Sequence, residues 1–494
     1  MITPALIMSD FPWLSTLLIL LALGALLALI SPLKWARWIT ISIQLIVLAL
    51  STFLVLHFNS TLSDFQYGER YNWIPSLNIH YQLGVDGFSV LFLPFSALLF
   101  VAIVISTWNA IRTLPKAYFA LILIMQLSIV GIFTALDTIL FFLFWELSVI
   151  PLFLLISFWG AGANRRYAGM KYALFMLMGG IPLLLGFLIL GASIPELGFY
   201  SDYFILLQNA YQQPYELIVF ALLFLGFAIK MPVFPLHTWL PVIAQEGPAG
   251  IIALVAGLKI GVYGLIRFAI PLAPNAAFDM KWLLVGLGML GLLYGAITAL
   301  GQTNLRRMLA FSSISHVGLV LLGIASLNPS GLQGAMLQLL NFSLIAGGLY
   351  LLVEFIHQRT GSAEALSLGG IAGNMPVLVS LFFLLSMASI GVPGTSGFIA
   401  EFLLIVSVLK TYTGAGLVAL FVVVLGAGYV LNSIRITLLG PAHHSYLTRL
   451  PDLLPRESVA ISLLVLGVLV FGFYPQGILN LLALSSGAWL SLVQ

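Results

Sequence analysis

Six ionisable side chains stand inside long apolar runs of this sequence: Glu146, Lys230, Lys259, His316, Glu354 and Glu401. An ionisable group at the centre of a bilayer costs about 2.5–3.5 kcal/mol on insertion scales, so each of them needs a partner or a function. Burial favours the neutral form of a lysine and a nearby carboxylate favours its charged form, so a Glu/Lys pair whose separation changes can bind and release a proton. A histidine titrates near neutral pH. Such groups in a row, joined by water, would conduct protons.

Each of these residues also has a purely structural interpretation, as an ion-paired side chain or as a side chain that reaches from a helix end to the membrane surface. Glu354 and Arg267 lie near the ends of their apolar runs, where the structural interpretation is as good as the functional one. Glu146, Lys230 and Lys259 lie where a charge is hardest to explain structurally, which favours a function. A lone intramembrane histidine is more often a hydrogen-bonded core residue.

Membrane-spanning helices must position these groups. The chain has 494 residues, of which 61% are hydrophobic and 7% charged, whereas about a quarter of the residues of a soluble domain are charged. Its mean hydropathy is +1.12. The apolar runs are continuous rather than alternating, which excludes a transmembrane β-barrel. The chain has no cysteine, so it can hold no disulfide, thiolate-bound zinc or cysteine-ligated iron–sulfur cluster.

Hydropathy and the positions of proline, glycine and charge predict an all-α polytopic membrane protein with about 14 transmembrane helices. The first apolar run has no basic segment before it and no cleavage pattern, so we expect a retained span rather than a signal peptide. The expected spans are residues 11–31, 35–57, 84–108, 117–137, 138–158, 168–193, 216–240, 249–270, 281–300, 304–327, 332–356, 374–411, 413–438 and 457–490.

The basic residues support this count independently. Connections after odd-numbered spans carry Lys34, Arg37, Arg112, Lys116, Arg165, Arg166, Lys171, Arg306, Arg307, Arg359, Arg435, Arg449 and Arg456. Connections after even-numbered spans carry only Arg70, Lys281 and Lys410. The positive-inside rule therefore places the odd connections on the cytoplasmic or stromal side and both termini on the lumenal or periplasmic side.

Two of the expected spans are interrupted by proline and glycine, at Pro232 and Pro235 in the seventh and at Pro393 and Gly394 in the twelfth. Proline removes a helix donor, and backbone groups freed at membrane depth are tolerated only inside protein or beside water. The breaks are five spans apart, which predicts two inverted five-helix repeats of the transporter kind. The chain is therefore expected to divide into an N-terminal three-span part, a first repeat, a second repeat and a last connection with its span, at residues 1–110, 111–272, 273–440 and 441–494.

Two motifs do not carry the function that their letters indicate. Residues 286–291 (GLGMLG) match the dinucleotide fingerprint, but they follow no strand and lie within an apolar span, so close helix packing explains them better. His443 and His444 form a surface pair with no other ligand nearby. We therefore expect no metal site there.

Four segments together resemble one family. They are FWELSVIP around Glu146, AIKMPVFPLHTWLP at 228–241, NLRRMLAFSSISHVG at 304–318 and VPGTSGFIAEF at 392–402. Over nearly its whole length the chain resembles the antiporter-like subunit called NuoM in bacterial complex I and NdhD in cyanobacterial and chloroplast NDH complexes. The segments FPWLST and LGVDG, at 11–16 and 83–87, look closer to the NdhD branch.

The resemblance implies fourteen helices, two inverted repeats and a proton path at mid-membrane. By position it implies one role for each residue of that path: Glu146 tunes the lysine, Lys230 accepts the proton before the first break, Lys259 connects the halves, His316 carries the proton onward and Glu401 is the terminal group. The function implied is proton translocation coupled to quinone reduction in a complex fed by NADH or ferredoxin.

Every redox centre of such a complex, its iron–sulfur clusters and its quinone, would lie on other subunits, so no cofactor or metal is expected in this chain. The expected partners are other membrane subunits of the complex and lipid, with no nucleic acid. The expected location is a cyanobacterial thylakoid membrane, or otherwise a bacterial inner membrane.

His237, Asn341 and Glu354 are expected as accessory residues. The family commonly has histidine where this chain has Asn341, and an amide cannot take up and release a proton near neutral pH, so Asn341 could only hold a water in the path. The family also usually continues with Asp-Ala-His where this chain has VIA at 242–244. These departures suggest a specialised paralogue, such as the NdhD forms of complexes devoted to carbon dioxide uptake.

Two other functions fit the same residues. A free-standing cation/proton antiporter would need a cation site at the broken helices, where Glu401 is the only carboxylate close to a break; sodium-dependent proton flux by the purified chain would favour it. A scaffold subunit with a degenerate path would fit Asn341. An assembled complex with such a scaffold would keep its proton stoichiometry after Glu146→Gln and Lys230→Ala.

Overall fold

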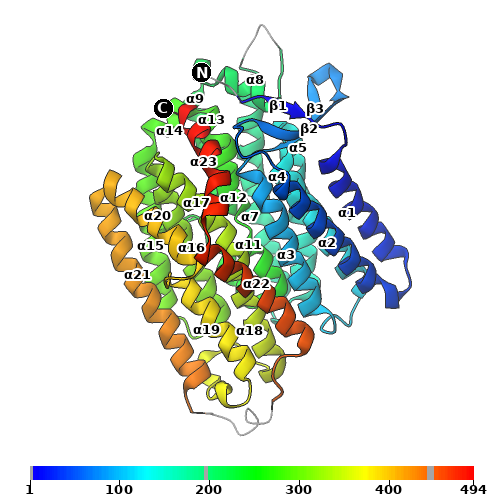
Figure 1. Ribbon diagram of the computed structural model, residues 1–494, viewed down its shortest axis with the longest axis vertical. Coiled ribbons are helices and arrows are strands. Elements are labelled where there is room, and N and C mark those ends of the chain that lie inside the picture. Colours follow the sequence, from blue (N-terminus) through cyan, green and yellow to red (C-terminus); the bar gives the residue numbers. More distant parts are fainter. Residues whose placement is uncertain (1–3, 194–197, 442–449, 494) are drawn as a thin grey trace.

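The computed structural model describes residues 4–193, 198–441 and 450–493. Most of its helices run side by side between two ends of one elongated bundle (Figure 1). Strand β1 (Leu6–Met8) and helix α23 (Gln476–Ser491) lie at the same end, as expected when both termini are on one side of the membrane. Which side this is stays a prediction from the charges. His443 and His444 lie outside the described residues.

Twelve helical segments in the described part of the chain are long and apolar enough to cross a membrane. The seventh and twelfth expected spans are missing from that set, because each is divided into two shorter helices. The seventh consists of α9 (Glu216–Lys230) and α10 (Trp239–Glu246), and the twelfth of α19 (Pro376–Ser389) and α20 (Ser396–Thr411). Both predicted interruptions are therefore confirmed, while the total of fourteen stays a prediction.

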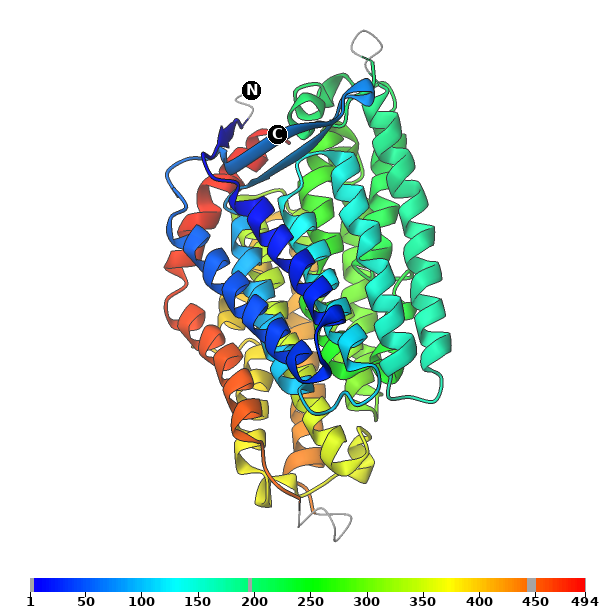
Figure 2. The ribbon, with the colours of Figure 1, turned by 90° about the vertical axis from the view of Figure 1, so that its right-hand side faces the viewer.

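The predicted helical membrane fold is confirmed, and the segment that joins the second and third spans departs from it by forming strands. The N-terminal helices are α1 (Trp13–Ile30), α2 (Leu33–Leu56) and α3 (Ser89–Thr107). Strands β2 (Phe65–Ile74) and β3 (Ile79–Val85) form an antiparallel pair around the 3-10 turn η1 (Pro75–Leu77), and β1 adds to β2. Figure 2 shows this sheet lying across the end of α1. The third span therefore begins later than its expected start at residue 84.

The next helices fall within residues 111–272, the range predicted for the first repeat. They are α4 (Pro115–Thr134), α5 (Thr138–Leu147), α6 (Val149–Trp159), α7 (Arg165–Gly191), α8 (Tyr203–Gln208), η2 (Ala210–Gln212), α9, α10, α11 (Ala249–Gly257), α12 (Ile260–Gly264), the π-helix η3 (Leu265–Ala269) and α13 (Ile270–Leu272). The short helix α14 (Pro274–Asp279) follows this range. Asp137 starts α5 because its carboxylate accepts hydrogen bonds from the backbone N–H groups of Ile139 and Leu140.

The second predicted repeat and the last part of the chain follow. Their elements are α15 (Lys281–Leu300), α16 (Leu305–Ala325), α17 (Pro329–Asn341), the π-helix η4 (Phe342–Ala346), α18 (Gly347–Thr360), η5 (Ala365–Ser367), η6 (Ile371–Gly373), α19, α20, α21 (Thr413–Ile434), the π-helix η7 (Arg435–Leu439), α22 (Pro455–Phe473) and α23. Asn304 caps α16 by accepting from the backbone N–H groups of Arg306 and Arg307. The expected last span, 457–490, is thus two helices separated at Tyr474 and Pro475.

The eighth span is also not continuous, which the sequence analysis did not anticipate. Helix α11 ends at Gly257 and α12 begins at Ile260, so Leu258 and Lys259 are unwound at the centre of this span. A Cβ on Gly261 would lie 2.6 Å from the backbone nitrogen of Met231, so this glycine lets the break approach the end of α9. The glycines at 257 and 261 were the local signal for this break.

The two most enclosed spans in the described residues carry Lys259 and His316. The windows within Ala249–Leu272 and Leu305–Ala325 are each 94% buried, whereas those of α1 and α2 are 39% and 33% buried. In Figure 2, α1 and α2 cover one flank of the bundle rather than its centre. The tertiary structure therefore places Lys259 and His316 in the protein interior, whereas the outer helices are the ones that contact lipid.

Candidate functional site

Lys230 is the last residue of α9, directly before the first break, and its side chain is buried. Its Nζ donates a hydrogen bond to the carbonyl oxygen of Trp145 at 3.1 Å and another to Ser148 Oγ at 2.8 Å. The same Nζ lies 3.9 Å from the centre of the Trp145 ring. The ammonium group is therefore held at the junction of α5 and α6, where helix carbonyls are free to accept.

Glu146 lies between the two residues that hold Lys230, but it does not close an ion pair with it. No nitrogen–oxygen distance of 4.0 Å or less joins the two side chains among the ion pairs of the described residues. Glu146 Oε1 is buried without a hydrogen-bond partner in that part of the chain, and it packs where a Cβ on Gly180 would be. The two side chains of the predicted pair are thus neighbours without an ion-pair contact, and we call this arrangement open.

A cavity of about 30 Å³ lies beside Lys230. Its walls include Tyr172, Trp239, Leu258 and Ile260. A water molecule needs roughly 10–15 Å³ of such space and polar partners, so this cavity can hold water next to the ammonium group. Leu258 and Ile260 are the chain neighbours of Lys259, so the cavity beside the first lysine lies near the segment that carries the second.

Lys259 occupies the unwound point of the eighth span, with its side chain buried. Its Nζ has no hydrogen-bond partner in the described residues and lies 5.3 Å from the centre of the Phe342 ring. Phe342 is the first residue of the π-helix η4, in the eleventh span. The side chain of Lys259 therefore reaches from the first predicted repeat to the second.

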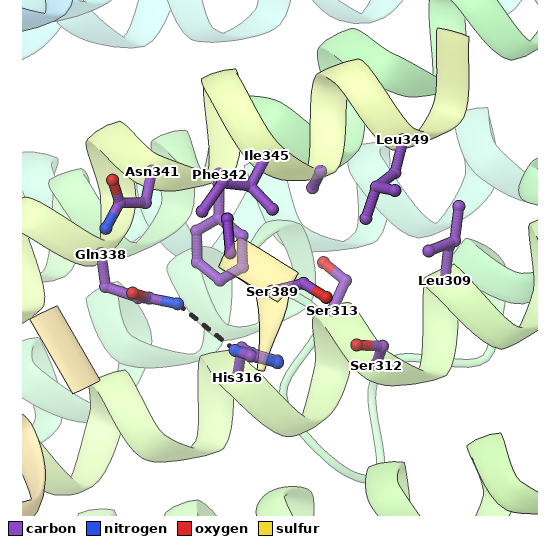
Figure 3. Close-up of a pocket in the computed structure, with 12 residues that line it drawn as sticks. Leu309, Ser312, Ser313, His316, Gln338, Asn341, Phe342, Ile345, Leu349 and Ser389 are labelled. Atoms are coloured by element: carbon purple, nitrogen blue, oxygen red, sulfur yellow. Dashed lines mark hydrogen bonds between the residues drawn. The ribbon is translucent and has the colours of Figure 1, made fainter. Parts of the chain in front are cut away.

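Phe342 lines a second cavity, of about 40 Å³ (Figure 3). Lys259 does not line this cavity but lies near the same ring. His316, Gln338 and Asn341 line this cavity together with the hydroxyl groups of Ser312 and Ser313. Gln338 Nε2 lies 3.3 Å from His316 Nδ1, within hydrogen-bond distance. The amide, imidazole and hydroxyl groups supply the polar partners that water in this cavity needs.

His316 also lines a third cavity, of about 30 Å³, whose other polar wall residues are Ser315, Ser389, Glu401 and Tyr429. His316 Nδ1 lies 3.5 Å from Glu401 Oε1. Glu401 is buried on α20, just after the second break, against Gly391. His316 and Ser389 thus line both the second and the third cavity.

Asn341 has a second role that the sequence did not indicate. Its Nδ2 donates a hydrogen bond to the carbonyl oxygen of Ser396 at 2.9 Å. Ser396 is the first residue of α20, after the second break. The amide therefore joins the eleventh span to the broken twelfth span while it lines the cavity beside His316.

Two accessory candidates lie away from these cavities. Glu354 accepts a hydrogen bond from Arg306 Nη2 at 3.0 Å and one from the backbone N–H of Ala249 at 3.3 Å, which ties three helix ends together. His237 packs among aromatic rings, 4.9 Å from the ring of Tyr294, and is absent from the walls of the three cavities. For Glu354 the structural interpretation fits better than the functional one.

Arg267 likewise has a structural partner. Its Nη2 lies 2.5 Å from Asp86 Oδ1, and both side chains are buried. The glycines of the 286–291 motif lie on α15, where a Cβ on Gly288 would be 3.0 Å from the carbonyl oxygen of Gly318. Close helix packing is therefore confirmed at Gly288, whereas a Cβ on Gly286 would meet nothing within 4 Å. No group of three or more potential metal ligands occurs within the described residues.

Several polar residues that line the cavities or bind Lys230 were not predicted from the sequence. Gln338 lies three positions before Asn341, on the same helix face, and this spacing was an available signal. Ser148 lies two positions after Glu146. Tyr429 comes from α21 and Tyr172 from α7, and nothing local in their segments indicates their place in the cavity walls.

Known proteins are similar to this chain over most of its length. Residues 135–426 match the transmembrane family of NADH:quinone oxidoreductase and Mrp antiporter subunits. The "NAD(P)H-quinone oxidoreductase chain 4 1" of Synechococcus sp. (strain JA-2-3B'a(2-13)) is 36% identical over 480 residues, which covers 94% of this chain and 90% of the relative. The NADH-quinone oxidoreductase subunit M of Rickettsia bellii (strain RML369-C) is 32% identical over 437 residues, with 88% and 87% covered.

The fold is shared as well. A chain of respiratory complex I from Thermus thermophilus, solved with bound NADH, has a TM-score of 0.87 to this structure at 29% sequence identity. The match covers 97% of this chain and 100% of that one. Sequence and fold therefore agree: the chain belongs to the antiporter-like membrane family of NADH:quinone oxidoreductase and Mrp subunits, on the branch of chain 4 and subunit M.

Proposed function

We propose that this chain is a proton-translocating membrane subunit of a complex I-like quinone oxidoreductase. The observation that carries the proposal is the row of buried groups and small cavities from Lys230 past Lys259 to His316 and Glu401, in which the Phe342 ring lies between Lys259 and the cavity beside His316. Two of these residues lie beside the breaks and one lies at an unwound point, where backbone groups at membrane depth need protein or water. The family membership supports the same function.

The open Glu146/Lys230 pair suggests how transfer begins. Lys230 is held by neutral oxygens of Trp145 and Ser148, so its charge is stabilised without the carboxylate. If Glu146 moves closer, it favours the charged lysine; if it withdraws, the lysine releases its proton to water in the adjoining cavity. Lys259 receives that proton at its unwound position. Water beside Gln338 and Asn341 then carries it past Phe342 to His316, and Glu401 is the last acceptor.

The partners of this chain in the proposal are the other membrane subunits of the complex, in keeping with the multisubunit complexes in which its structural relatives occur. Quinone and the iron–sulfur clusters belong to other subunits, and this chain translocates protons without a redox centre. A cyanobacterial thylakoid membrane is the proposed location, with both termini on the lumenal side. Similarity to chain 4 of a cyanobacterial oxidoreductase supports that location.

A scaffold function is the second candidate. Asn341 favours it, because an amide stands where the family commonly has histidine, and its hydrogen bond to Ser396 is a structural one. The antiporter function has less support. Glu401 is the carboxylate at a break in the described residues, and its near partner is His316 rather than another carboxylate.

The deciding experiment measures proton uptake per quinone reduced by the assembled complex in liposomes. Lys230→Ala is expected to lower the ratio, and Asn341→His is expected to leave it nearly unchanged. Lys410→Ala is the matched control, because Lys410 is exposed at the end of α20. An unchanged ratio in an assembled Lys230→Ala complex would assign pumping to other subunits and leave this chain as a scaffold.

A further inference from the structure

Two arginines from opposite ends of the chain meet at one end of the bundle. Arg37 lies near the start of α2 and Arg456 near the start of α22, and both contact the loop that follows α3. This is the end that the positive-inside rule assigns to the cytoplasm. In Figure 2, α3 lies between α2 and α22 at this end.

Asn109, in that loop, stands between the two guanidinium groups. Its amide oxygen lies 3.5 Å from Arg37 Nη1 in one orientation. With the amide turned over, its oxygen lies 3.1 and 2.9 Å from Nη1 and Nη2 of Arg456. An amide has one oxygen, so whichever guanidinium it accepts from, the other faces the NH₂ donors of the same amide. Arg37 Nη1 also donates to the carbonyl oxygen of Trp108 at 3.4 Å. The two guanidinium groups together still carry more N–H donors than this carbonyl oxygen and one amide oxygen can accept.

The missing acceptor is not a carboxylate of this chain. Four other arginines in the described residues have one within 4.0 Å, in the pairs Arg70–Asp202, Arg267–Asp86, Arg306–Glu354 and Arg359–Glu457. Arg37 and Arg456 are in none of these pairs. Arg456 Nε is moreover buried without a hydrogen-bond partner among the described residues. Residues 442–449 contain no Asp or Glu that could supply one.

The surroundings of the site belong to a membrane surface. Arg37 lies over the Trp108 ring, 5.5 Å from its centre, and Trp38 packs against the same ring at 4.8 Å. Trp35 and Trp38 are 61% and 55% exposed. Exposed tryptophans of this kind mark the headgroup level of a bilayer. On α22, Val459, Leu463 and Leu466 are also exposed, about one to three turns deeper than Arg456, so apolar surface continues from the arginines into the membrane.

We infer that Arg37, Asn109 and Arg456 form a binding site for the phosphate group of an anionic phospholipid. The guanidinium fork matches phosphate oxygens geometrically, and a phosphate would accept from both arginines while Asn109 donates to it. Free inorganic phosphate offers the same oxygens. The exposed tryptophans and the apolar surface of α22 favour the lipid, because they add contacts for the glycerol and acyl chains.

The test measures lipid retained by the purified, assembled complex. The complex is delipidated in mild detergent, incubated with an equal mixture of phosphatidylglycerol and phosphatidylcholine, and examined by native mass spectrometry. The variants are the double change Arg37→Gln with Arg456→Gln, and Arg435→Gln as the matched control. Arg435 is exposed and already has an acceptor in Asn432, at 2.9 Å.

The expected result is loss of one retained phosphatidylglycerol in the double variant and none in the control. A second variant, Asn109→Asp, places a carboxylate between the guanidiniums; it is expected to release the lipid while the complex stays assembled. Equal retention by wild type and both site variants, or equal loss in the control, would overturn the proposal. Displacement of the lipid by excess inorganic phosphate would show a free-anion site instead.

Discussion

Lys230 donates a 2.8 Å hydrogen bond to Ser148 Oγ, and this hydroxyl, rather than the carboxylate of Glu146, is its closest polar contact. The lysine at the first break is therefore held by uncharged oxygens. Glu146 stands between the two residues that provide them, with one buried oxygen that lacks a partner in the described chain. Small movements of α5 against α9 can then change the lysine–carboxylate separation without breaking a salt bridge.

Ser148→Ala should destabilise the charged form of Lys230. A hydrogen bond from a charged group contributes about 1.5–3 kcal/mol, so the proton occupancy of this lysine should fall and proton uptake per quinone should fall with it. Ser157→Ala is the control on the same helix, because Ser157 Oγ is buried without a hydrogen-bond partner in the described chain. Equal effects of the two changes would argue against a role for the hydroxyl.

Gly180→Ala should displace the Glu146 carboxylate. The new Cβ would overlap Glu146 Oε1, so the carboxylate must move toward or away from Lys230, and the proton ratio should change in a complex that still assembles. Gly286→Ala is the matched control on α15, because its Cβ would meet nothing within 4 Å. A wild-type ratio in Gly180→Ala would mean that the position of this carboxylate does not matter for transfer.

Glu401→Gln should stop transfer beyond His316. Glutamine keeps the size of the side chain and its contact near Gly391, but it cannot accept and release a proton. We expect proton uptake per quinone to fall by the share that this subunit carries, with the amount of assembled complex unchanged. The exposed residue Asp279 provides the control Asp279→Asn. A wild-type value of proton uptake per quinone in Glu401→Gln would show that protons leave this subunit through another residue.

Asp86→Asn should destabilise the protein without entering the proton path. It leaves the guanidinium of Arg267 buried and without its carboxylate, and removing one partner of a buried pair costs about 3–5 kcal/mol. The melting temperature of the purified complex should fall clearly below that of Asp10→Asn, whose side chain is exposed. The complexes that do assemble should keep the wild-type proton ratio; a lower ratio would place this pair in the path.

The two arginines at Asn109 have a relationship in the structure beyond the charge that assigns the sides of the membrane. In sequence, Arg37 and Arg456 only help to assign the sides of the membrane. In the structure they converge on one amide that cannot satisfy both. Their distance along the chain, from the second span to the start of the last, hid this relationship from any local pattern.

The sequence by itself determined the membrane class, the two main breaks and the identity of the buried titratable residues. Composition decides whether a surface faces lipid, and Pro232, Pro235, Pro393 and Gly394 disrupt helices through their own backbone chemistry. Both are local properties that hold in any fold. The row of Glu146, Lys230, Lys259, His316 and Glu401 is visible for the same reason, since a charge in an apolar run is costly wherever the helix lies.

Only the tertiary structure decided which of these groups meet and where water can join them. The cavities have walls from helices far apart in the chain, as with Tyr429 of α21 beside His316 of α16. The open state of the Glu146/Lys230 pair depends on how α5 packs against α7 and α9. The hairpin of β2 and β3 was not predicted from the sequence. Its residues are too polar for a span, and its two strands pair with each other without a repeated sequence pattern that would indicate the pairing. Such contacts are set by packing between distant segments, which no local pattern records.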